Sequence, residues 1–417
     1  MTNNGGRARG GASRRQLLRL AGGGVGLSLL GAGAVGCEED VADGTGSGTP
    51  KPSGKGDGKG DGNPDAGASG DGGVPKPLWT ETAAVHPGTG DGGLIAVSGL
   101  VLTAGKPMSA RDGASGKEKW SLPDGTVPTS KLLVAGGRLY LPSAEYDNSV
   151  IGYDPATGQE KWRSRAGKGF RQPRVIAVDE KHVYVIAGIL EKDFSSERNV
   201  IAALDTGSGR AVWQEQRDFG TEETGITAAV HGNRLVYTDF KKNLTVRDTA
   251  TGKQVWTQKT DKTNFKGFAV HEGLVILAQG RELQAFALSD GAKKWKLEAG
   301  RFGSFRQPGV VDGVLYVADS SRTLWAVRPA SGEKIWQSED IAEADGKTPW
   351  QYAGAGGTLY AATELDENGG VHAVDAASGK LRWTFNDGSG DYHKWLVATD
   401  GERVFALHGK KLHALPL

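Results

Sequence analysis

The stretch Ala110-Arg-Asp-Gly-Ala-Ser-Gly-Lys-Glu-Lys-Trp120 decides the fold, because its pattern returns along the chain. The clearest copies are Gly152-Tyr-Asp-Pro-Ala-Thr-Gly-Gln-Glu-Lys-Trp162, Ala203-Leu-Asp-Thr-Gly-Ser-Gly-Arg-Ala-Val-Trp213 and Val246-Arg-Asp-Thr-Ala-Thr-Gly-Lys-Gln-Val-Trp256. Three further copies end at Trp295, Trp336 and Trp383. From Trp120 onward, successive tryptophans stand 42, 51, 43, 39, 41 and 47 residues apart. This is the repeat length of a propeller blade with four strands.

Each copy reads as a strand, a tight turn and a second strand. An Asp near its start can accept hydrogen bonds from the turn, and a Gly four residues later supplies a left-handed backbone position. The Asp residues are Asp112, Asp154, Asp205, Asp248 and Asp375, and the Gly residues are Gly116, Gly158, Gly209, Gly252 and Gly379. The copies at Ala287 and Arg328 lack this Asp, so we expect looser turns there.

A hairpin precedes each copy and supplies two further strands, as in residues 133–140, 229–237 and 309–317. After Trp383 the chain has room for only three strands, the last within 411–417. The missing outer strand is expected at Lys76-Pro-Leu-Trp79, where Trp79 stands 41 residues before Trp120. Pairing the two ends covers strand edges that would otherwise promote aggregation. The sequence therefore predicts an all-β fold: an eight-bladed β-propeller of four-stranded blades, closed by an N-terminal strand that completes the last blade.

Composition agrees with this class of protein. Of the 417 residues, 65 are Gly and 37% are hydrophobic, and a repeat architecture can exceed the usual size of one domain. Lys and Arg number 50 against 49 Asp and Glu, which gives a formal net charge of +1. This balance gives no electrostatic reason to expect a nucleic-acid partner.

The first residues have the layout of an export signal. Arg14 and Arg15 precede a run of small residues that is too rich in Gly for a membrane-spanning helix. The order Ser13-Arg-Arg-Gln-Leu-Leu-Arg19 resembles a twin-arginine signal. The general secretory route remains the alternative.

Cys37 is the single cysteine of the chain. The order Ala34-Val-Gly-Cys37 resembles a lipobox, which implies that Cys37 carries lipid. Residues 38–75 are mostly Gly, Asp, Lys, Pro and Ser, and they cannot bury enough apolar surface to fold. We expect a lipoprotein signal peptide over 1–37, a disordered linker over 38–75 and a propeller domain over 76–417. The protein would be extracytoplasmic and held on the cell membrane through its lipid anchor alone.

The repeated phrase resembles the repeat of the pyrrolo-quinoline quinone (PQQ) propeller family over about residues 76–417, and the architecture is similar to that of BamB-like propeller lipoproteins. The resemblance implies that the blade tryptophans dock neighbouring blades and do not contact a ligand. These residues are Trp79, Trp120, Trp162, Trp213, Trp256, Trp295, Trp336 and Trp383. The resemblance does not imply an outer-membrane partner for this chain, because one fold hosts many functions.

No motif in the sequence identifies a catalytic centre. Quinone-dependent alcohol dehydrogenases of this fold class place a vicinal disulfide over the cofactor, and a chain with no cysteine after Cys37 cannot form one. The eight histidines are scattered along the chain. We therefore expect no cofactor and no metal, and we favour a protein that is not an enzyme.

Aromatic and polar residues before the innermost strands form a candidate ligand face. A propeller gathers these segments around the mouth of its central funnel, and aromatic and Arg side chains are common in binding hot spots. The candidates are Phe170, Arg171, Gln172, Phe305, Arg306, Gln307, Trp350, Gln351, Tyr352, His393 and Trp395. Arg171 and Arg306 each follow Phe and precede Gln-Pro, so we expect equivalent positions for them. The alternative is that all these side chains plug the funnel and brace the blades.

The leading hypothesis is a non-catalytic binding or scaffolding lipoprotein, a monomer that engages a protein or peptide through one propeller face. One alternative is a PQQ- or metal-dependent oxidoreductase with a nonstandard site. Another is a ligand-sensing propeller for a neighbouring membrane enzyme. If the candidate face does not bind, the longer loops at 191–199 and 364–370 are the next places to examine.

Overall fold

The computed structural model describes residues 73–84, 91–127, 130–145, 147–164, 170–190, 197–216, 226–238, 243–261 and 265–417. The chain divides into two units, 1–63 and 64–417, and every described residue belongs to the second. The predicted export residues Arg14 and Arg15, the predicted lipidation site Cys37 and most of the expected linker lie outside the described residues. Within the described part, no helix is long and apolar enough to cross a membrane.

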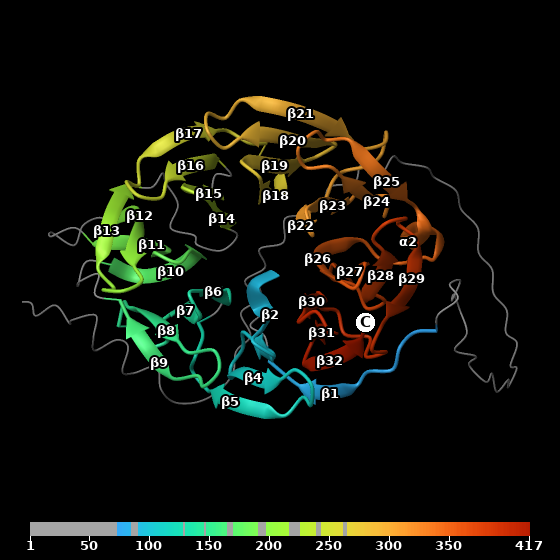
Figure 1. Ribbon diagram of the computed structural model, residues 1–417, viewed down its shortest axis with the longest axis horizontal. Coiled ribbons are helices and arrows are strands. Elements are labelled where there is room, and N and C mark those ends of the chain that lie inside the picture. Colours follow the sequence, from blue (N-terminus) through green and yellow to red (C-terminus); the bar gives the residue numbers. More distant parts are fainter. Residues whose placement is uncertain are drawn as a thin grey trace, which may run out of the picture. The chain divides into compact units, whose positions relative to one another are not determined.

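Eight antiparallel sheets of four strands each form the blades of a propeller ring (Figure 1). We number the blades in chain order. Blade 1 contains β2 (Leu94–Val97), β3 (Leu100–Thr103), β4 (Met108–Asp112) and β5 (Glu118–Leu122), and blade 2 contains β6 (Leu133–Ala135), β7 (Arg138–Pro142), β8 (Val150–Tyr153) and β9 (Glu160–Arg163). Blade 3 contains β10 (Phe170–Val178), β11 (His182–Leu190), β12 (Glu197–Asp205) and β13 (Ala211–Gln216), and blade 4 contains β14 (Ala228–His231), β15 (Arg234–Thr238), β16 (Leu244–Asp248) and β17 (Gln254–Gln258).

The second half of the ring repeats this order. Blade 5 contains β18 (Phe265–His271), β19 (Leu274–Gln279), β20 (Glu282–Ala287) and β21 (Lys293–Glu298), and blade 6 contains β22 (Gly309–Val311), β23 (Val314–Ala318), β24 (Leu324–Val327) and β25 (Lys334–Ser338). Blade 7 contains β26 (Pro349–Ala355), β27 (Thr358–Thr363), β28 (Val371–Asp375) and β29 (Leu381–Phe385). Two short helices, η1 (Asp91–Gly93) and α2 (Asp340–Glu343), lie in connections between blades.

Blade 8 joins the two ends of the domain. It contains β30 (Leu396–Thr399), β31 (Arg403–His408), β32 (Lys411–Pro416) and β1 (Trp79–Thr82), which is its outer strand. Trp79 pairs with Ala414, and Thr82 pairs with Lys411. The predicted eight-bladed propeller, closed by an N-terminal strand, is thereby confirmed.

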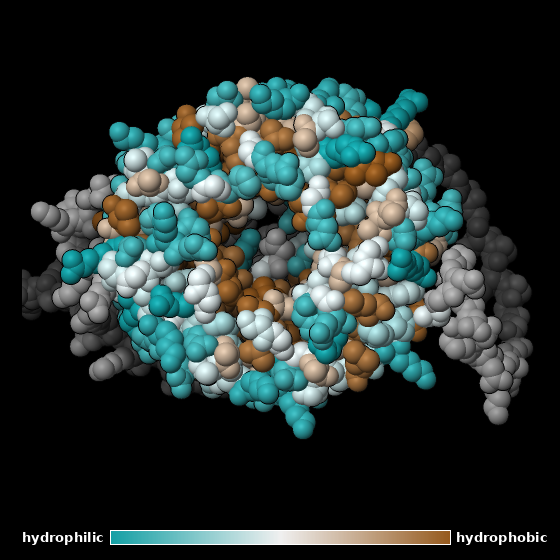
Figure 2. All heavy atoms as spheres, viewed as in Figure 1, coloured by the Kyte–Doolittle hydropathy of each residue, from teal (hydrophilic) through white to brown (hydrophobic). Residues whose placement is uncertain are grey.

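The hydrophobic core lies between neighbouring blades. Tyr140 and Trp162 of blade 2 pack in one cluster with Phe170 and Val185 of blade 3, and similar clusters join the other blades. Viewed along the propeller axis, hydrophilic residues cover most of the outer margin, and hydrophobic residues gather around a central hollow (Figure 2). Each blade therefore depends on its neighbours for a buried surface.

The repeated phrase explains how blades dock. The indole of Trp120 donates a hydrogen bond of 2.9 Å to the carbonyl of Pro155 in the turn of the next blade. A Cβ at Gly158 of that turn would lie 2.8 Å from the ring of Trp120, so the turn needs Gly both for its φ of 69° and for contact with the indole. Six indoles make the bond to the next blade: those of Trp79, Trp120, Trp213, Trp256, Trp295 and Trp336.

The junction between blades 2 and 3 departs from this pattern. The indole nitrogen of Trp162 is buried and has no hydrogen-bond partner. The carbonyl that corresponds to its expected acceptor belongs to Thr206, and the Arg138 guanidinium donates to it at 3.0 Å. At this junction, the Arg138 guanidinium of blade 2 therefore makes the hydrogen bond that a tryptophan indole makes at six other junctions.

The expectation of looser turns at Ala287 and Arg328 is wrong. The backbone bond from Gly291 to the Ala287 carbonyl and that from Gly332 to the Arg328 carbonyl are both 2.9 Å long. The equivalent bond to Asp112 is 2.8 Å long. Backbone hydrogen bonds and the left-handed Gly define the turn by themselves, and the Asp carboxylate adds bonds to a turn that already exists.

The strand order fixes two faces of the ring. In an antiparallel blade, the connection into the first strand and the loop between the second and third strands lie at the same end. Since every blade begins in the same way, these segments from all eight blades lie on one face, which we call the funnel face. The turns of the repeated phrase lie on the opposite face.

Candidate functional site

All the candidate ligand residues lie where a first strand begins, and therefore on the funnel face. Phe170, Arg171 and Gln172 begin β10; Phe305, Arg306 and Gln307 precede β22; Trp350, Gln351 and Tyr352 lie in β26; His393 and Trp395 precede β30. The structure separates them into a buried aromatic part and a more exposed polar part.

The aromatic candidates brace the blades. Phe305 is fully buried and packs edge-on against Trp325 at 5.5 Å between ring centroids. The buried indole of Trp350 donates to the carbonyl of Trp395 at 3.1 Å, which links blade 7 to blade 8. The hydroxyl of Tyr352 accepts a bond of 2.9 Å from the Ala318 amide of blade 6. These rings shape the entrance of the funnel but offer little surface to a ligand.

The polar candidates lie nearer to solvent. Arg171, Gln172 and His393 are exposed. Arg306 faces Glu364 of the neighbouring blade, with 3.8 Å between the guanidinium nitrogen and the carboxylate oxygen. Gln351 instead serves the fold, because its side-chain oxygen accepts the Val397 amide at 3.0 Å.

Arg171 and Arg306 are not equivalent, which corrects the expectation from their shared Phe-Arg-Gln-Pro order. The tyrosines Tyr184 of β11 and Tyr316 of β23 occupy corresponding positions in the second strands of blades 3 and 6. Phe170 pairs with Ile189, which is five residues after Tyr184. Phe305 pairs with Asp319, which is only three residues after Tyr316. Strands β10, β11 and β12 have nine residues each, and β10 contains two register shifts. The longer blade 3 therefore carries Arg171 further along the sheet than Arg306.

A pocket of about 190 Å³ lies at the junction of blades 2 and 3 on the funnel face. It is lined by Val127, Pro142, Ser143, Asn148, Ser149, Gln172, Pro173 and Arg174. The apolar lining residues Val127, Pro142 and Pro173 are buried, whereas Asn148 and Gln172 are exposed at the rim. Few convergent polar groups around an apolar floor are typical of a binding site.

The rim of this pocket is held in an unusual backbone conformation. Asn148 has a φ of 65° and Gln172 a φ of 47°, a region that residues other than Gly rarely adopt. The backbone N–H of Gln172 donates a hydrogen bond of 3.1 Å to the side-chain oxygen of Asn148. The two strained residues therefore bridge blades 2 and 3. Strain of this kind persists only where the surroundings enforce it, and it is concentrated at functional sites.

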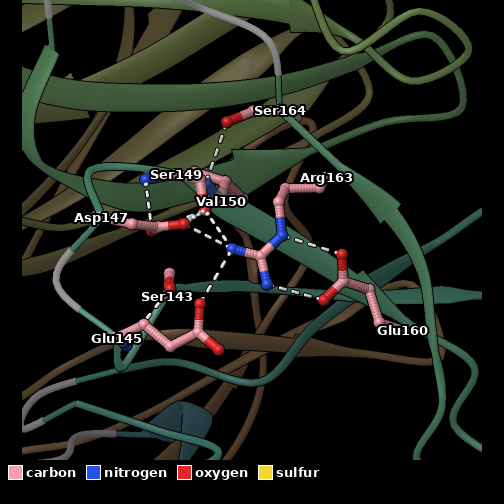
Figure 3. Close-up of polar contacts among 8 residues, drawn as sticks. All are labelled: Ser143, Glu145, Asp147, Ser149, Val150, Glu160, Arg163 and Ser164. Atoms are coloured by element: carbon pink, nitrogen blue, oxygen red, sulfur yellow. Dashed lines mark hydrogen bonds and ion pairs between the residues drawn. The ribbon is translucent and has the colours of Figure 1, made fainter. Parts of the chain in front are cut away.

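Arg163 at the end of β9 fixes the loop that supplies half of the pocket (Figure 3). Its guanidinium donates to Glu160 through two bonds of 2.8 and 2.7 Å, to Glu145 at 3.2 Å and to Asp147. It also reaches the hydroxyl of Ser149 at 3.1 Å. Hydrogen bonds from Arg163 hold the pKa of Glu160 below its ordinary value, because they favour the ionised carboxylate. The described residues of this loop, 143–145 and 147–149, are therefore held in place before a ligand binds.

Sequence reasoning found Gln172 but missed the rest of the pocket. Its other lining residues come from the connection into β6, the end of β7, the loop between β7 and β8, and positions 173 and 174 of β10. The polar run Asp147-Asn-Ser149 indicates a turn. Nothing in the sequence, however, places that turn beside β10 of the next blade.

The buried histidines form a separate group. Asp387 lies between two of them in blade 8, 3.2 Å from a ring nitrogen of His408 and 3.7 Å from one of His413, and all three side chains are buried. The other nitrogen of His413 is 2.9 Å from the Thr80 hydroxyl of β1. In the described residues, no group of three or more His, Cys, Asp or Glu has the geometry to hold a metal ion. This cluster supports the closing blade.

Comparisons with known proteins agree with the fold. A family model described as outer membrane protein assembly factor BamB matches residues 71–191 and 197–351. The serine/threonine-protein kinase AfsK of Streptomyces griseus is 28% identical over 44% of this chain and 28% of its own length. Outer membrane protein assembly factor BamB of Yersinia pestis is 25% identical over 51% of this chain and 60% of its own length. The chain thus spans less than two thirds of either relative.

A solved structure gives the same result at the level of the fold. The crystal structure of BamB from Moraxella catarrhalis superposes with a TM-score of 0.58 and covers 82% of this chain and 100% of that one. The two sequences are 14% identical, so the likeness concerns the fold alone.

Proposed function

The chain belongs to the family described as outer membrane protein assembly factor BamB, and from this premise we propose that it is a non-catalytic binding or scaffolding protein. It is exported, is tethered outside the cytoplasm by lipid on Cys37, and engages a protein or peptide through the funnel face. The observation that carries the proposal is the preorganised pocket between blades 2 and 3.

The size of the pocket favours a peptide over a cofactor. Its volume of about 190 Å³ lies below the ~300–1,000 Å³ of sites that enclose a small molecule. A single side chain of a partner would occupy such a volume. The rim offers the Gln172 and Asn148 side chains, which can bond to the backbone of the peptide on either side.

The scaffold around the pocket supports the same function. Arg163 and the bridge from Gln172 to Asn148 hold the rim before any ligand arrives. A preformed site loses less conformational entropy on binding, so modest contact area can give useful affinity.

Selection of peptides from a display library of short random sequences tests the proposal. We expect the native protein to enrich a set of peptides that a variant with Gln172→Ala and Arg174→Ala does not bind. The reason is that both side chains line the pocket, and losing hot-spot contacts costs about 1.4 kcal/mol or more, which is tenfold in affinity.

A matched control uses the variant with Gln254→Ala and Arg210→Ala, which removes the same residue types at exposed positions outside the pocket. It should bind the selected peptides as the native protein does. Equal enrichment by the native protein and the pocket variant, with both folded, would show that the pocket is not the binding site.

The oxidoreductase alternative has its own test. The purified protein is titrated with PQQ, with and without calcium, and absorbance is recorded. We expect no saturable spectral change. Saturation at one equivalent of PQQ would contradict a non-catalytic role.

The match to a kinase favours a second candidate function, that of a ligand sensor for a neighbouring membrane enzyme. AfsK is named a serine/threonine-protein kinase, and the aligned part is a minor fraction of it. A sensor would use the same funnel face. Cross-linking in the native membrane distinguishes the two, because a sensor should yield an enzyme as its main adduct, and ligand added before the cross-linker should reduce the yield of that adduct.

A further inference from the structure

We propose that His408 is a buried, positively charged ring that holds the connection into blade 8, residues 386–395, on the funnel face. Loss of one proton from this ring would release the connection, so the funnel face would respond to pH. The connection joins β29 to β30 and carries the exposed residues Tyr392, His393 and Lys394. This inference goes beyond the proposed function, because it concerns the conformation of the face and not the ligand.

His408 lies at the end of β31, and its side chain is fully buried. Its Nδ1 lies 3.2 Å from a carboxylate oxygen of Asp387 and 3.3 Å from the hydroxyl of Ser389. Its Nε2 lies 3.0 Å from the backbone carbonyl oxygen of Asp391. The ring also stacks on Trp395, with 4.2 Å between the centroids and 8° between the planes. One side chain therefore contacts four positions of the connection.

The partners of the two ring nitrogens determine the protonation of His408. A carbonyl oxygen and an ionised carboxylate only accept hydrogen bonds, so each needs a proton on the nitrogen that faces it. A neutral ring has one such proton, and a nitrogen lone pair would then face the Asp391 carbonyl or the Asp387 carboxylate. The Ser389 hydroxyl could donate to a neutral Nδ1, but the Asp387 oxygen would still face the same lone pair. Both nitrogens therefore carry a proton.

Asp387 supplies the opposite charge. Only 2% of its side chain is exposed. Burial raises the pKa of Asp387, but hydrogen bonds from Ser389 and the charge of His408 outweigh burial, and the net shift is downward. One carboxylate oxygen accepts the Ser389 amide at 3.0 Å, whereas the other is buried without a hydrogen-bond partner. A buried carboxylate with so few hydrogen bonds requires a cation beside it.

The other titratable groups around the ring do not supply this cation. His413 of β32 lies 3.7 Å from Asp387, but burial lowers the pKa of His413 and so favours its neutral form. Lys411, which pairs with His408 in the sheet, is exposed. The remaining titratable groups of the connection are also exposed: Asp391, His393 and Lys394. The indole stacked on His408 favours a cation as well, because the face of an aromatic ring attracts positive charge.

The direction of the pH effect follows from these contacts. A group that the folded state favours in its protonated form contributes stability at low pH, and this stability is lost as the pH rises. When His408 loses a proton, one nitrogen lone pair faces an oxygen and Asp387 loses its opposite charge. The connection is therefore held in acid and released in alkali. Histidine is the side chain that ordinarily exchanges its proton near neutral pH.

Hydrogen–deuterium exchange of the full chain tests the release. Four amides donate hydrogen bonds within the connection: those of Gly388, Ser389, Asp391 and His393. Their exchange is measured at about pH 6 and about pH 8.5 and corrected for the intrinsic rate at each pH. We expect exchange in this segment to be at least about tenfold faster at the higher pH, because the connection opens locally. The strands of the other blades should keep their protection.

The variant Asp387→Asn removes the opposite charge and keeps the shape of the side chain. It should lower the pH at which the connection opens by about one unit or more, because a neutral amide no longer favours the charged ring. Asp391→Asn is the matched control, since it removes the same charge from the same segment and keeps the backbone carbonyl that faces His408. His393→Gln removes the exposed histidine. Both controls should open close to the native pH.

Nitrogen NMR of histidine-labelled protein examines the proton itself. The His408 signals are those that disappear in His408→Gln or, if that variant does not fold, those that move most in Asp387→Asn. At about pH 6 we expect both nitrogens of His408 to carry a proton.

A single protonated nitrogen on His408 at that pH, or exchange that is equal at the two pH values, would overturn the proposal. Equal shifts in Asp387→Asn and Asp391→Asn would also overturn it, because the effect would then belong to the net charge of the segment. These measurements use no peptide, so their failure leaves the proposed function intact.

Discussion

Glycine has two separate tasks in the turns of the blades, and two turns of blade 6 distinguish them: one in the hairpin between β22 and β23, the other in the repeated phrase between β24 and β25. Gly332 and Gly313 have nearly the same left-handed backbone, with φ of 74° and 76°. A Cβ at Gly332 would lie 2.6 Å from the ring of Trp295, whereas a Cβ at Gly313 would meet nothing within 4 Å. Position 313 therefore needs Gly only for its left-handed φ, whereas position 332 needs Gly both for its φ and for contact with the docking indole.

We expect Gly332→Ala to lower the free energy of unfolding by roughly 1–3 kcal/mol more than Gly313→Ala. Both variants carry the cost of about 1–2 kcal/mol for a left-handed Ala, and only Gly332→Ala adds overpacking of about 1–3 kcal/mol. Urea unfolding measures the difference. Equal losses would mean that the indole can move away from the turn at little cost.

His372 makes the stability of the propeller sensitive to acid. The ring is buried, with one nitrogen 2.8 Å from the Thr384 hydroxyl and the other 2.9 Å from the Lys347 carbonyl. Burial lowers the pKa of His372 to about 4. The unfolded chain therefore takes up a proton below pH 6.5 that the folded chain refuses, so stability present above pH 6.5 is lost as the pH falls toward 4.

The loss assigned to His372 is about 3 kcal/mol between pH 7 and pH 4, from the difference between its folded and unfolded pKa values. We expect the stability difference between native protein and His372→Gln to shrink by this amount over that range, as measured by urea unfolding at each pH. The exposed His393, changed to Gln, serves as control. A difference that stays constant with pH would show that His372 does not titrate in this way.

At the scale of elements, the docking tryptophans divide by their hydrogen bonds. Trp213 donates to the Thr249 carbonyl at 2.7 Å, whereas the Trp162 indole has no partner, and both side chains are more than nine-tenths buried. Trp162→Phe should therefore cost about 1 kcal/mol less than Trp213→Phe, because no hydrogen bond is lost. Guanidinium unfolding of the two variants gives the comparison, and a larger loss for Trp162→Phe would contradict it.

The strand β1 has a structural role that the preceding linker lacks. A variant without residues 38–70 keeps β1, and a variant without residues 38–82 loses it and uncovers the edge of β32. We expect the first to unfold at the native temperature and the second to lose several kcal/mol or to aggregate. Equal stability and equal solubility of the two variants would mean that the pairing of β1 with β32 contributes nothing.

The elements could be predicted from the sequence because each copy of the phrase carries its own signals. Asp, Gly and Trp stand at fixed spacing, and this was enough for the number of blades and the closing strand. The candidate site was found only in part. The sequence places Gln172 on the candidate ligand face, where it lies at the rim of the pocket, but it does not reveal the position of Arg171, because the register shifts within β10 leave no local mark in the sequence.

At the scale of the whole molecule, anchoring should be independent of folding. Cys37 precedes the described propeller by more than thirty residues, so Cys37→Ala should release the protein from washed membranes and leave its melting temperature unchanged. Fractionation and a thermal melt of the released protein give the two measurements. Persistence of the variant in the membrane fraction would mean that another segment holds the protein there.

The pairing of β1 with β32 also affects the order in which the blades can form. Thr80 and His413 touch in the closing blade although 333 residues separate them, and contacts between distant parts of a chain form late in folding. Seven blades consist of strands that are consecutive in the chain, whereas the eighth is complete only when β32 pairs with β1. Before this pairing forms, the blades make an open arc with two uncovered strand edges, and such edges expose the chain to aggregation.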